Sequence, residues 1–150
     1  MDTTLLDRLL AIGALFQTDM QRAFAGTSLT ESRVHALWVL QHSGPATQQC
    51  LAEALRVTPR SISALVDALE SAGYAKRLPH PDDRRAVLVA LTPSAERMMT
   101  RMQEDHRHLS DRLLSAVDAE DRAAFERGVD AVLRALTELV AEEQVRYGDR

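Results

Sequence analysis

The sequence contains a single cysteine and no long apolar run. Cys50 cannot form a disulfide within the chain, which favours a reducing compartment. No apolar segment approaches the ~18 residues of a membrane-spanning helix. The N-terminus also lacks the basic start and apolar stretch of a signal peptide. We therefore expect a cytoplasmic protein that has no membrane partner.

The motifs of catalysis and cofactor binding are missing as well. The sequence has no glycine-rich phosphate loop and no Gly-x-Ser-x-Gly nucleophile motif. Its five histidines show no metal-ligand spacing, and one cysteine is too few for a structural zinc site. A thiol hydrolase that pairs Cys50 with a distant histidine has no local signature here. These absences predict a protein that is not an enzyme and needs no metal or cofactor.

The net charge of −4 conceals a basic segment. Residues 55–85 hold six basic and four acidic side chains, a net charge of +2, whereas the other residues hold twelve basic and eighteen acidic ones, a net charge of −6. Phosphate binding depends on the charges near a site rather than on the chain average. Residues 55–85 are therefore a candidate nucleic-acid surface.

Apolar residues spaced three and four apart predict long helices at both ends of the chain, over residues 3–24 and 93–145. Thr92 and Pro93 resemble a helix cap and first residue, and Asp118 is the expected cap of a last helix. These helices carry more apolar surface than a thin middle layer can cover. We expect them to pack against a second copy of the chain, although a monomeric bundle that closes on itself is the alternative.

Shorter helices are expected in the middle of the chain. Thr30 fits a helix cap, and the Ser-Gly-Pro at 43–45 fits the end of that helix. A second short helix is expected over residues 47–55. After a tight turn, Thr58 caps a third helix that places Pro59 in its first position and ends at Gly73. Two short helices joined in this way are typical of a helix-turn-helix.

The hydrophobic period then changes from that of a helix to that of a strand. Residues 74–78 and 85–91 are expected strands, and the turn-rich sequence PHPDDR lies between them. Val87, Val89 and Leu91 are expected on one apolar face. The predicted fold class is mainly α, a winged helix-turn-helix of about six helices and a two-stranded β-wing, with a helical dimerisation region.

The helix that begins after Thr58 carries small, polar and basic side chains away from its apolar face. In a helix-turn-helix, the start of the second helix enters the major groove of DNA. Arg60 can donate two parallel hydrogen bonds to guanine, and Ser61 and Ser63 can reach a base edge or a phosphate. A solvated helix start is the alternative for Arg60, but a cation there opposes the helix dipole, which favours a role with a partner. The candidate DNA contacts on this helix are Thr58, Pro59, Arg60, Ser61, Ser63 and Ala64.

The PHPDDRR sequence predicts a second element that contacts DNA. Arginines at the tip of a two-stranded ribbon suit the minor groove, whose narrow A·T stretches concentrate negative potential. Asp83 can hold an arginine side chain extended through a hydrogen-bonded pair. An ordinary charged turn is the alternative. The candidate DNA contacts of the wing are Arg77, Asp83, Arg84 and Arg85.

From about Ser28 to Ala95 the sequence resembles the MarR family of regulators. The landmarks are Leu51-Ala52, the run LVDALESAGY at 65–74, Asp83-Arg84-Arg85 and Leu91-Thr92. The resemblance implies that the bases are read by Arg60, Ser61, Ser63 and Ala64, and that Arg85 is the wing arginine with Asp83 as its partner.

The resemblance also implies an organisation and a function. It implies one MarR-type domain over residues 1–150, with a winged helix-turn-helix lobe at 30–92 and a dimerisation region at 3–24 and 93–145. It further implies a sequence-specific transcriptional repressor, bound as a homodimer to an inverted repeat in double-stranded DNA.

Members of this family commonly release DNA when a small, often aromatic, anion binds between the dimerisation region and the DNA-binding lobe. The resemblance therefore implies a small aromatic or anionic effector. The residues expected around such a site would also suit a plain core, and they are Phe16, Met20, His35, Trp38, Met99 and Met102.

Two other functions stay open from the sequence. One is a winged helix that binds protein instead of DNA. The other is a redox-responsive regulator that uses Cys50, although the peroxide-sensing branch of the family carries its reactive cysteine near the first helix, where nothing matches in this chain.

Overall fold

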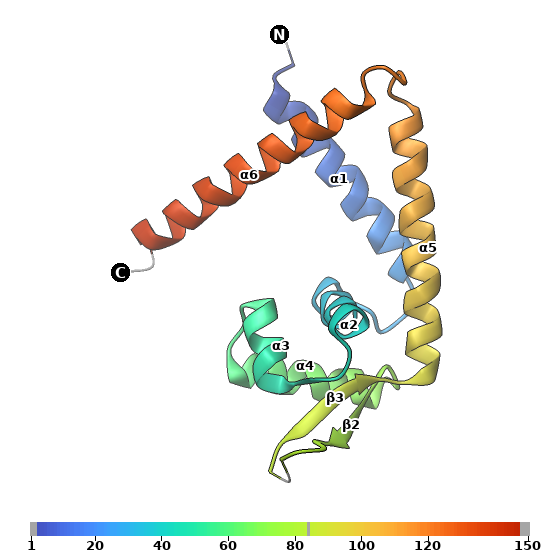
Figure 1. The fold of residues 1–150 in the computed structure, drawn as a ribbon, viewed down its shortest axis with the longest axis vertical. Coiled ribbons are helices and arrows are strands. Elements are labelled where there is room, and N and C mark those ends of the chain that lie inside the picture. The colour runs from blue at the N-terminus through green and yellow to red at the C-terminus, as the bar shows by residue number, and fades with distance from the viewer. Residues whose placement is uncertain (1–2, 84, 148–150) are drawn as a thin grey trace. The chain divides into compact units, whose positions relative to one another are not determined.

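The structure is a computed structural model that describes residues 3–83 and 85–147. The chain divides into two units, one up to Thr100 and one from Arg101 onward, and each is described by itself. The described residues form six helices and a three-stranded sheet, which confirms the predicted mainly α class (Figure 1). In chain order the elements are α1 (Leu5–Phe24), α2 (Glu31–Ser43), β1 (Ala46–Thr47), α3 (Gln48–Leu55), α4 (Pro59–Ser71), β2 (Ala75–Pro79), β3 (Val87–Leu91), α5 (Pro93–Ser115) and α6 (Arg122–Tyr147).

Threonine side chains begin the three helices of the helix-turn-helix region. Thr30, Thr47 and Thr58 each accept a hydrogen bond from the backbone N–H three residues later, at 3.2 to 3.3 Å. Each hydroxyl thereby satisfies a backbone donor that has no partner inside its own helix. The expected caps at Thr30 and Thr58 are confirmed.

A tight turn joins α3 to α4. It is made by Arg56, which adopts a left-handed backbone conformation with φ 54° and ψ 45°. The N–H of Val57 then donates to the carbonyl of Ala52 at 3.0 Å and closes the end of α3. This turn sets the direction in which α4 leaves α3.

The core of the first unit lies between α2, α3, α4 and the sheet. Seven large side chains are completely enclosed, and they come from five different elements: Leu37, Leu51, Ile62, Val66, Leu69, Val89 and Met99. Burying one such side chain contributes roughly 1.5–3 kcal/mol. Because Ile62, Val66 and Leu69 fix the inner face of α4, its opposite face is left exposed to solvent.

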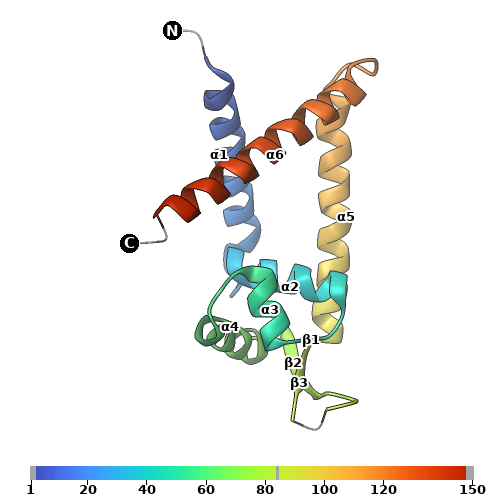
Figure 2. The same ribbon diagram turned by 60° about the vertical axis from the view of Figure 1, so that its left-hand side comes forward.

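The sheet is antiparallel, and β3 is its middle strand, between β1 and β2. The sequence predicted only the two-stranded wing, and the prediction of two strands was incomplete because β1 is just two residues long. Figures 1 and 2 show β2 and β3 projecting from the helices of this unit as a hairpin. The pairing runs from Ala75 opposite Leu91 to Pro79 opposite Val87.

The expected alternation along the last strand is wrong at both of its ends. The strand begins at Val87, so Arg85 lies in the loop, and Val87 is 47% exposed while Ala90 is buried. Val87 lies at the wing's outer end, opposite Pro79, beyond the helices that form the core. At the other end Val89, Ala90 and Leu91 are all buried, so both faces of the strand are covered there.

Helix α5 begins as expected, because the N–H of Ala95 donates to the hydroxyl of Thr92 at 3.2 Å. The expected cap at Asp118 is wrong. The N–H of Asp121 donates to the backbone carbonyl of Asp118 at 2.9 Å, which closes a turn, and α6 begins only at Arg122. Because both aspartates suit a helix cap, the sequence placed the start of this helix three residues too early.

Apolar side chains lie exposed along α1 and α6. No residue of α1 is buried. The exposed large apolar residues of α1 are Leu5, Leu6, Leu10, Ile12, Leu15, Phe16 and Met20, and those of α6 are Phe125, Val129, Leu133, Leu136, Leu139 and Val140. No helix among the described residues is both long enough and apolar enough to cross a membrane.

Candidate nucleic-acid interface

The first turn of α4 presents polar groups to solvent. Thr58, Pro59, Arg60, Ser61 and Ala64 are exposed, and Ser63 is half-buried at the edge of the apolar face. The hydroxyls of Thr58 and Ser61 are hydrogen-bonded to each other at 2.9 Å. All six predicted contact residues of this helix thus lie at its start. Together they form an exposed surface of hydroxyls, one guanidinium and small side chains.

The tip of the wing is an ordered turn within the described residues. The Nδ1 atom of His80 accepts hydrogen bonds from the backbone N–H groups of Asp82 and Asp83, both at 3.1 Å. The N–H of Ala86 donates to the carbonyl of Asp83 at 3.0 Å, and the N–H of His80 donates to the carbonyl of Ala86 at 3.2 Å. The imidazole therefore acts as the acceptor around which the tip is folded. The sequence did not single out His80 for this role.

Asp83 bonds to the backbone of Arg85. Its Oδ1 atom accepts from the N–H of Arg85 at 2.9 Å, the turn in which an aspartate binds the amide two residues later. The sequence had suggested that Asp83 holds an arginine side chain. Among the described residues, its carboxylate instead bonds the main chain of Arg85 and not the guanidinium. The fourth wing candidate, Arg84, lies outside the described residues. The side chain of Arg85 is exposed beside this turn.

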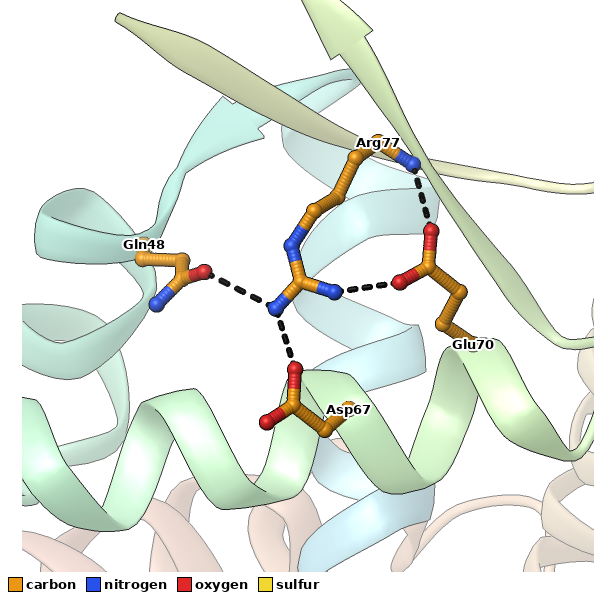
Figure 3. Close-up of polar contacts among 4 residues, drawn as sticks. All are labelled: Gln48, Asp67, Glu70 and Arg77. Carbon is orange, nitrogen blue, oxygen red and sulfur yellow. Dashed lines mark hydrogen bonds and ion pairs between the residues drawn. The ribbon is translucent and has the colours of Figure 1, made fainter.

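Arg77 on β2 connects three elements (Figure 3). One nitrogen of its guanidinium, Nη2, lies 2.5 Å from Oδ1 of Asp67 and 3.2 Å from Oε1 of Gln48. The other, Nη1, donates to Oε2 of Glu70, and the backbone N–H of Arg77 donates to Oε1 of Glu70 at 3.3 Å. The pKa of Arg77 lies above its usual value: the hydrogen bond that its guanidinium donates to Asp67 raises the pKa most, burial lowers it, and the hydrogen bond donated to Glu70 raises it again. The guanidinium is therefore held in its charged form.

This arrangement gives Arg77 a different setting from the one expected of a DNA contact, since its donors are directed at the protein. In the sequence, Asp67 and Glu70 stand out only as charges, and no pattern singles out Gln48. One signal was present: two acids three residues apart on α4, followed by a basic strand. Opposite charges do not reveal by themselves which of Lys76 and Arg77 turns toward the helix.

The residues expected around an effector lie in different surroundings. Met99 is completely buried, Trp38 is half-buried and His35 is exposed. The ring of Trp38 lies 6.0 Å from that of His42, centroid to centroid. Met102 belongs to the unit that begins at Arg101.

Hollows in the first unit include two that bear on these predictions. One, of about 330 Å³, includes Met20 from the expected effector set; its lining is Gln17, Met20, Gln21, Phe24, Leu29, Thr30 and Glu31. The other, of about 540 Å³, lies between α3 and α4; its lining is Gln48, Gln49, Ala52, Glu53, Arg56, Val57, Pro59 and Ile62. Cys50 is exposed on α3 as a free thiol.

Comparisons with known proteins show which family the chain resembles. The model of the MarR family matches residues 29–87. The uncharacterized HTH-type transcriptional regulator ML2140 of Mycobacterium leprae is 31% identical over 108 residues, which cover 71% of this chain and 75% of that protein. The HTH-type transcriptional repressor NicR of Pseudomonas putida is 28% identical over 132 residues, which cover 83% of this chain and 84% of that protein. For the uncharacterized HTH-type transcriptional regulator YfiV of Bacillus subtilis, 28% identical, the match covers 69% of this chain and 65% of that protein.

A solved structure shows the same fold. FabT of Streptococcus pneumoniae, in complex with DNA, superposes with a TM-score of 0.81 at 19% identity, and the match covers 90% of this chain and 96% of that one. The capped helix-turn-helix, the β2–β3 wing and the matching relatives lead to one conclusion. The chain belongs to the MarR family of winged helix-turn-helix transcriptional regulators.

Proposed function

We propose that the protein is a transcriptional repressor that reads double-stranded DNA with the first turn of α4 and contacts the minor groove with the wing. The observation that carries this proposal is the exposed polar start of α4 opposite a completely buried apolar face. Arg60 and Ser61 suit base edges in the major groove, and Arg85 suits the minor groove. The FabT structure, which has this fold and holds DNA, supports the same use of the fold. The protein acts by binding and not by catalysis, in the cytoplasm.

The proposed active form is a homodimer. The exposed apolar faces of α1 and α6 support this, because water-exposed stripes of this length on helices are typical of surfaces that a second chain covers. We assign residues 30–92 to the DNA-binding lobe and residues 3–24 and 93–145 to the dimerisation region of one MarR-type domain. A two-fold dimer then reads an inverted repeat whose half-sites are about 34–36 Å apart, one turn of DNA.

We also propose that a small aromatic or anionic effector weakens DNA binding. Met20 and Phe16 are partly exposed on α1, and the hollow that includes Met20 is about 330 Å³, within the usual range for small ligands. A tenfold loss of DNA affinity requires only about 1.4 kcal/mol of preference for the conformation that does not fit DNA. A panel of phenolic and drug-like acids should include compounds that raise the melting temperature and release DNA. If no compound does either, the effector proposal fails.

Selection from random double-stranded DNA tests the central proposal. The protein should enrich a short inverted repeat, and its affinity should fall steeply as salt rises, because Lys and Arg contacts release counterions from phosphates. Enrichment of no sequence, together with weak binding that does not depend on salt, would instead support a winged helix that binds protein.

A further inference from the structure

The guanidinium of Arg77 joins a strand of the wing to both helices of the helix-turn-helix. Asp67 and Glu70 lie on α4, Gln48 is the first residue of α3, and Arg77 itself lies on β2 of the wing. The side chain of Arg77 is only 29% exposed. Residues far apart in the sequence thereby meet at one point, and Gln48 and Arg77 are 29 positions apart in the sequence.

Asp67 makes this contact important for DNA. Residues three and four apart share one face of a helix, so Arg60, Ala64 and Asp67 follow one another along the exposed side of α4. The Asp67 side chain is 62% exposed. A carboxylate on a surface that approaches phosphates costs binding energy unless a cation neutralises it. Arg77 supplies that cation at 2.5 Å.

We infer that Arg77 is a positioning residue for DNA binding: it holds the wing against α4, its single positive charge offsets one of the two negative charges of Asp67 and Glu70, and it acts on DNA only through these contacts. The inference rests on the proposed function in one respect, the DNA readout. The planar fork of the guanidinium suits this role, because its separate N–H groups bond two carboxylates and an amide at once. The single ammonium group of a lysine cannot reproduce that geometry.

A double-mutant comparison separates this role from direct phosphate contact. Arg77→Ala should weaken binding to the selected DNA by about tenfold, within the usual range of coupling between neighbouring groups. In a protein that already carries Asp67→Asn and Glu70→Gln, the same substitution should cost less than about threefold, because its partners are gone. Lys76→Ala is the matched control. Lys76 is an exposed cation on the same strand without an ion pair among the described residues, and its effect should be equal in both backgrounds.

Equal losses for Arg77→Ala in the two backgrounds, within about twofold, would mean that Arg77 contacts DNA directly and would overturn the inference. Wild-type binding by Arg77→Ala would overturn it as well. If Arg77→Ala does not fold, Arg77→Lys is compared across the two backgrounds by the same criterion.

Amide hydrogen exchange without DNA tests, independently of the proposed function, whether Arg77 anchors the wing to α4. We call this contact the anchor. Arg77→Ala should accelerate exchange at backbone amides of β2 and β3, whereas Lys76→Ala should not. If the wild-type protein selects no DNA but these amides behave as expected, the repressor proposal fails and the anchor stands. Unchanged exchange in Arg77→Ala would show that Arg77 does not anchor the wing, whatever the DNA-binding result.

Discussion

At the scale of single residues, Arg60 lies exposed in the first turn of α4, two residues after the capping Thr58. A cation near the positive end of a helix dipole costs stability, so the fold itself gains nothing from an arginine there. This placement favours the proposed role of Arg60 in binding DNA.

Replacing Arg60 with alanine tests that binding role. If Arg60 bonds a guanine, Arg60→Ala should cost roughly 1–3 kcal/mol per half-site and relax the sequence preference at one position. Binding-site selection with the variant measures both effects. A loss of equal size on every sequence would identify Arg60 as a phosphate contact instead.

The two neighbouring acids at the wing tip differ in one bond. Asp83 holds the backbone N–H of Arg85, whereas the side chain of Asp82 makes no hydrogen bond among the described residues. Losing a hydrogen bond that orders Arg85 costs about 0.5–1.5 kcal/mol, so Asp83→Ala should weaken DNA binding several-fold. Asp82→Ala, which removes the same charge, should leave affinity unchanged or improve it. Titrations at two salt concentrations compare the pair, and tighter binding by Asp83→Ala at both would reject the ordering role.

Arg85 itself should contribute through its charge. Arg85→Ala should weaken binding to most sequences, with the larger loss on A·T-rich flanks, where the minor groove is narrow. The slope of log affinity against log salt should fall by up to about one unit per subunit. An unchanged slope would place the guanidinium away from the phosphates.

At the scale of elements, the turn between α3 and α4 depends on a residue that is poorly suited to it. Among the described residues other than glycine, only Arg56 has a positive φ, at 54°. A left-handed conformation costs an L-residue about 1–2 kcal/mol, whereas glycine adopts it readily.

Arg56→Gly should therefore be more stable than Arg56→Ala, by up to about 1 kcal/mol after the entropy that glycine loses on folding. The alanine variant is the matched control, because both substitutions remove the charge and only one keeps the Cβ atom. Thermal unfolding should show a higher midpoint for the glycine variant, by about 2–4 °C. A midpoint equal to or below that of Arg56→Ala would contradict the strain argument.

The sequence predicted those elements whose first residue is marked by a single capping side chain. Thr30, Thr58 and Thr92 were recognisable caps because each precedes an apolar helical repeat. The strand β1 was not predictable in this way, since two residues show no period and its pairing with β3 depends on residues more than forty positions later. The start of α6 was misplaced because Asp118 and Asp121 both suit a cap, and only the backbone bond between them shows that the first belongs to a turn.

The candidate site was predictable to a similar extent. The exposed start of α4 follows from helix period, because fixing Ile62, Val66 and Leu69 inward fixes what lies outward. The role of Arg77 did not follow, because strand period alone does not give the direction of a long side chain toward a particular helix. The sequence showed a basic wing, whereas the ion pairs of Arg77 depend on how β2 packs beside α4.

At the scale of the whole molecule, the exposed stripe of α6 is the feature that most needs a partner. The apolar repeat of α6 would be the same whether other helices of its own chain or a second copy of the chain covered the stripe. Sequence alone therefore could not distinguish a monomer from a dimer. Leu136 lies in the middle of that stripe and is 46% exposed.

Leu136→Asp should shift the protein toward monomers, because a carboxylate cannot be buried in an apolar contact without a partner. Ala131→Asp is the control, since Ala131 is exposed outside the stripe and receives the same charge. Analytical ultracentrifugation at micromolar concentration should give a monomer or a mixture for the first variant and a dimer for the second. A stable wild-type monomer, or a Leu136→Asp dimer as tight as the wild type, would reject α6 as a dimer contact.

The sheet also bears on how the protein is made. β3 is the strand to which both β1 and β2 bind, yet it comes last of the three in the chain. While a ribosome is still synthesising residues before Val87, the nascent chain already holds α3 and α4 but has nothing for β1 to pair with. Closing that long loop is a slow kind of contact to form. The sheet therefore reaches its finished shape only once Leu91 has left the exit tunnel, so a chain released earlier carries α3 and α4 without the strand that completes the sheet beside them.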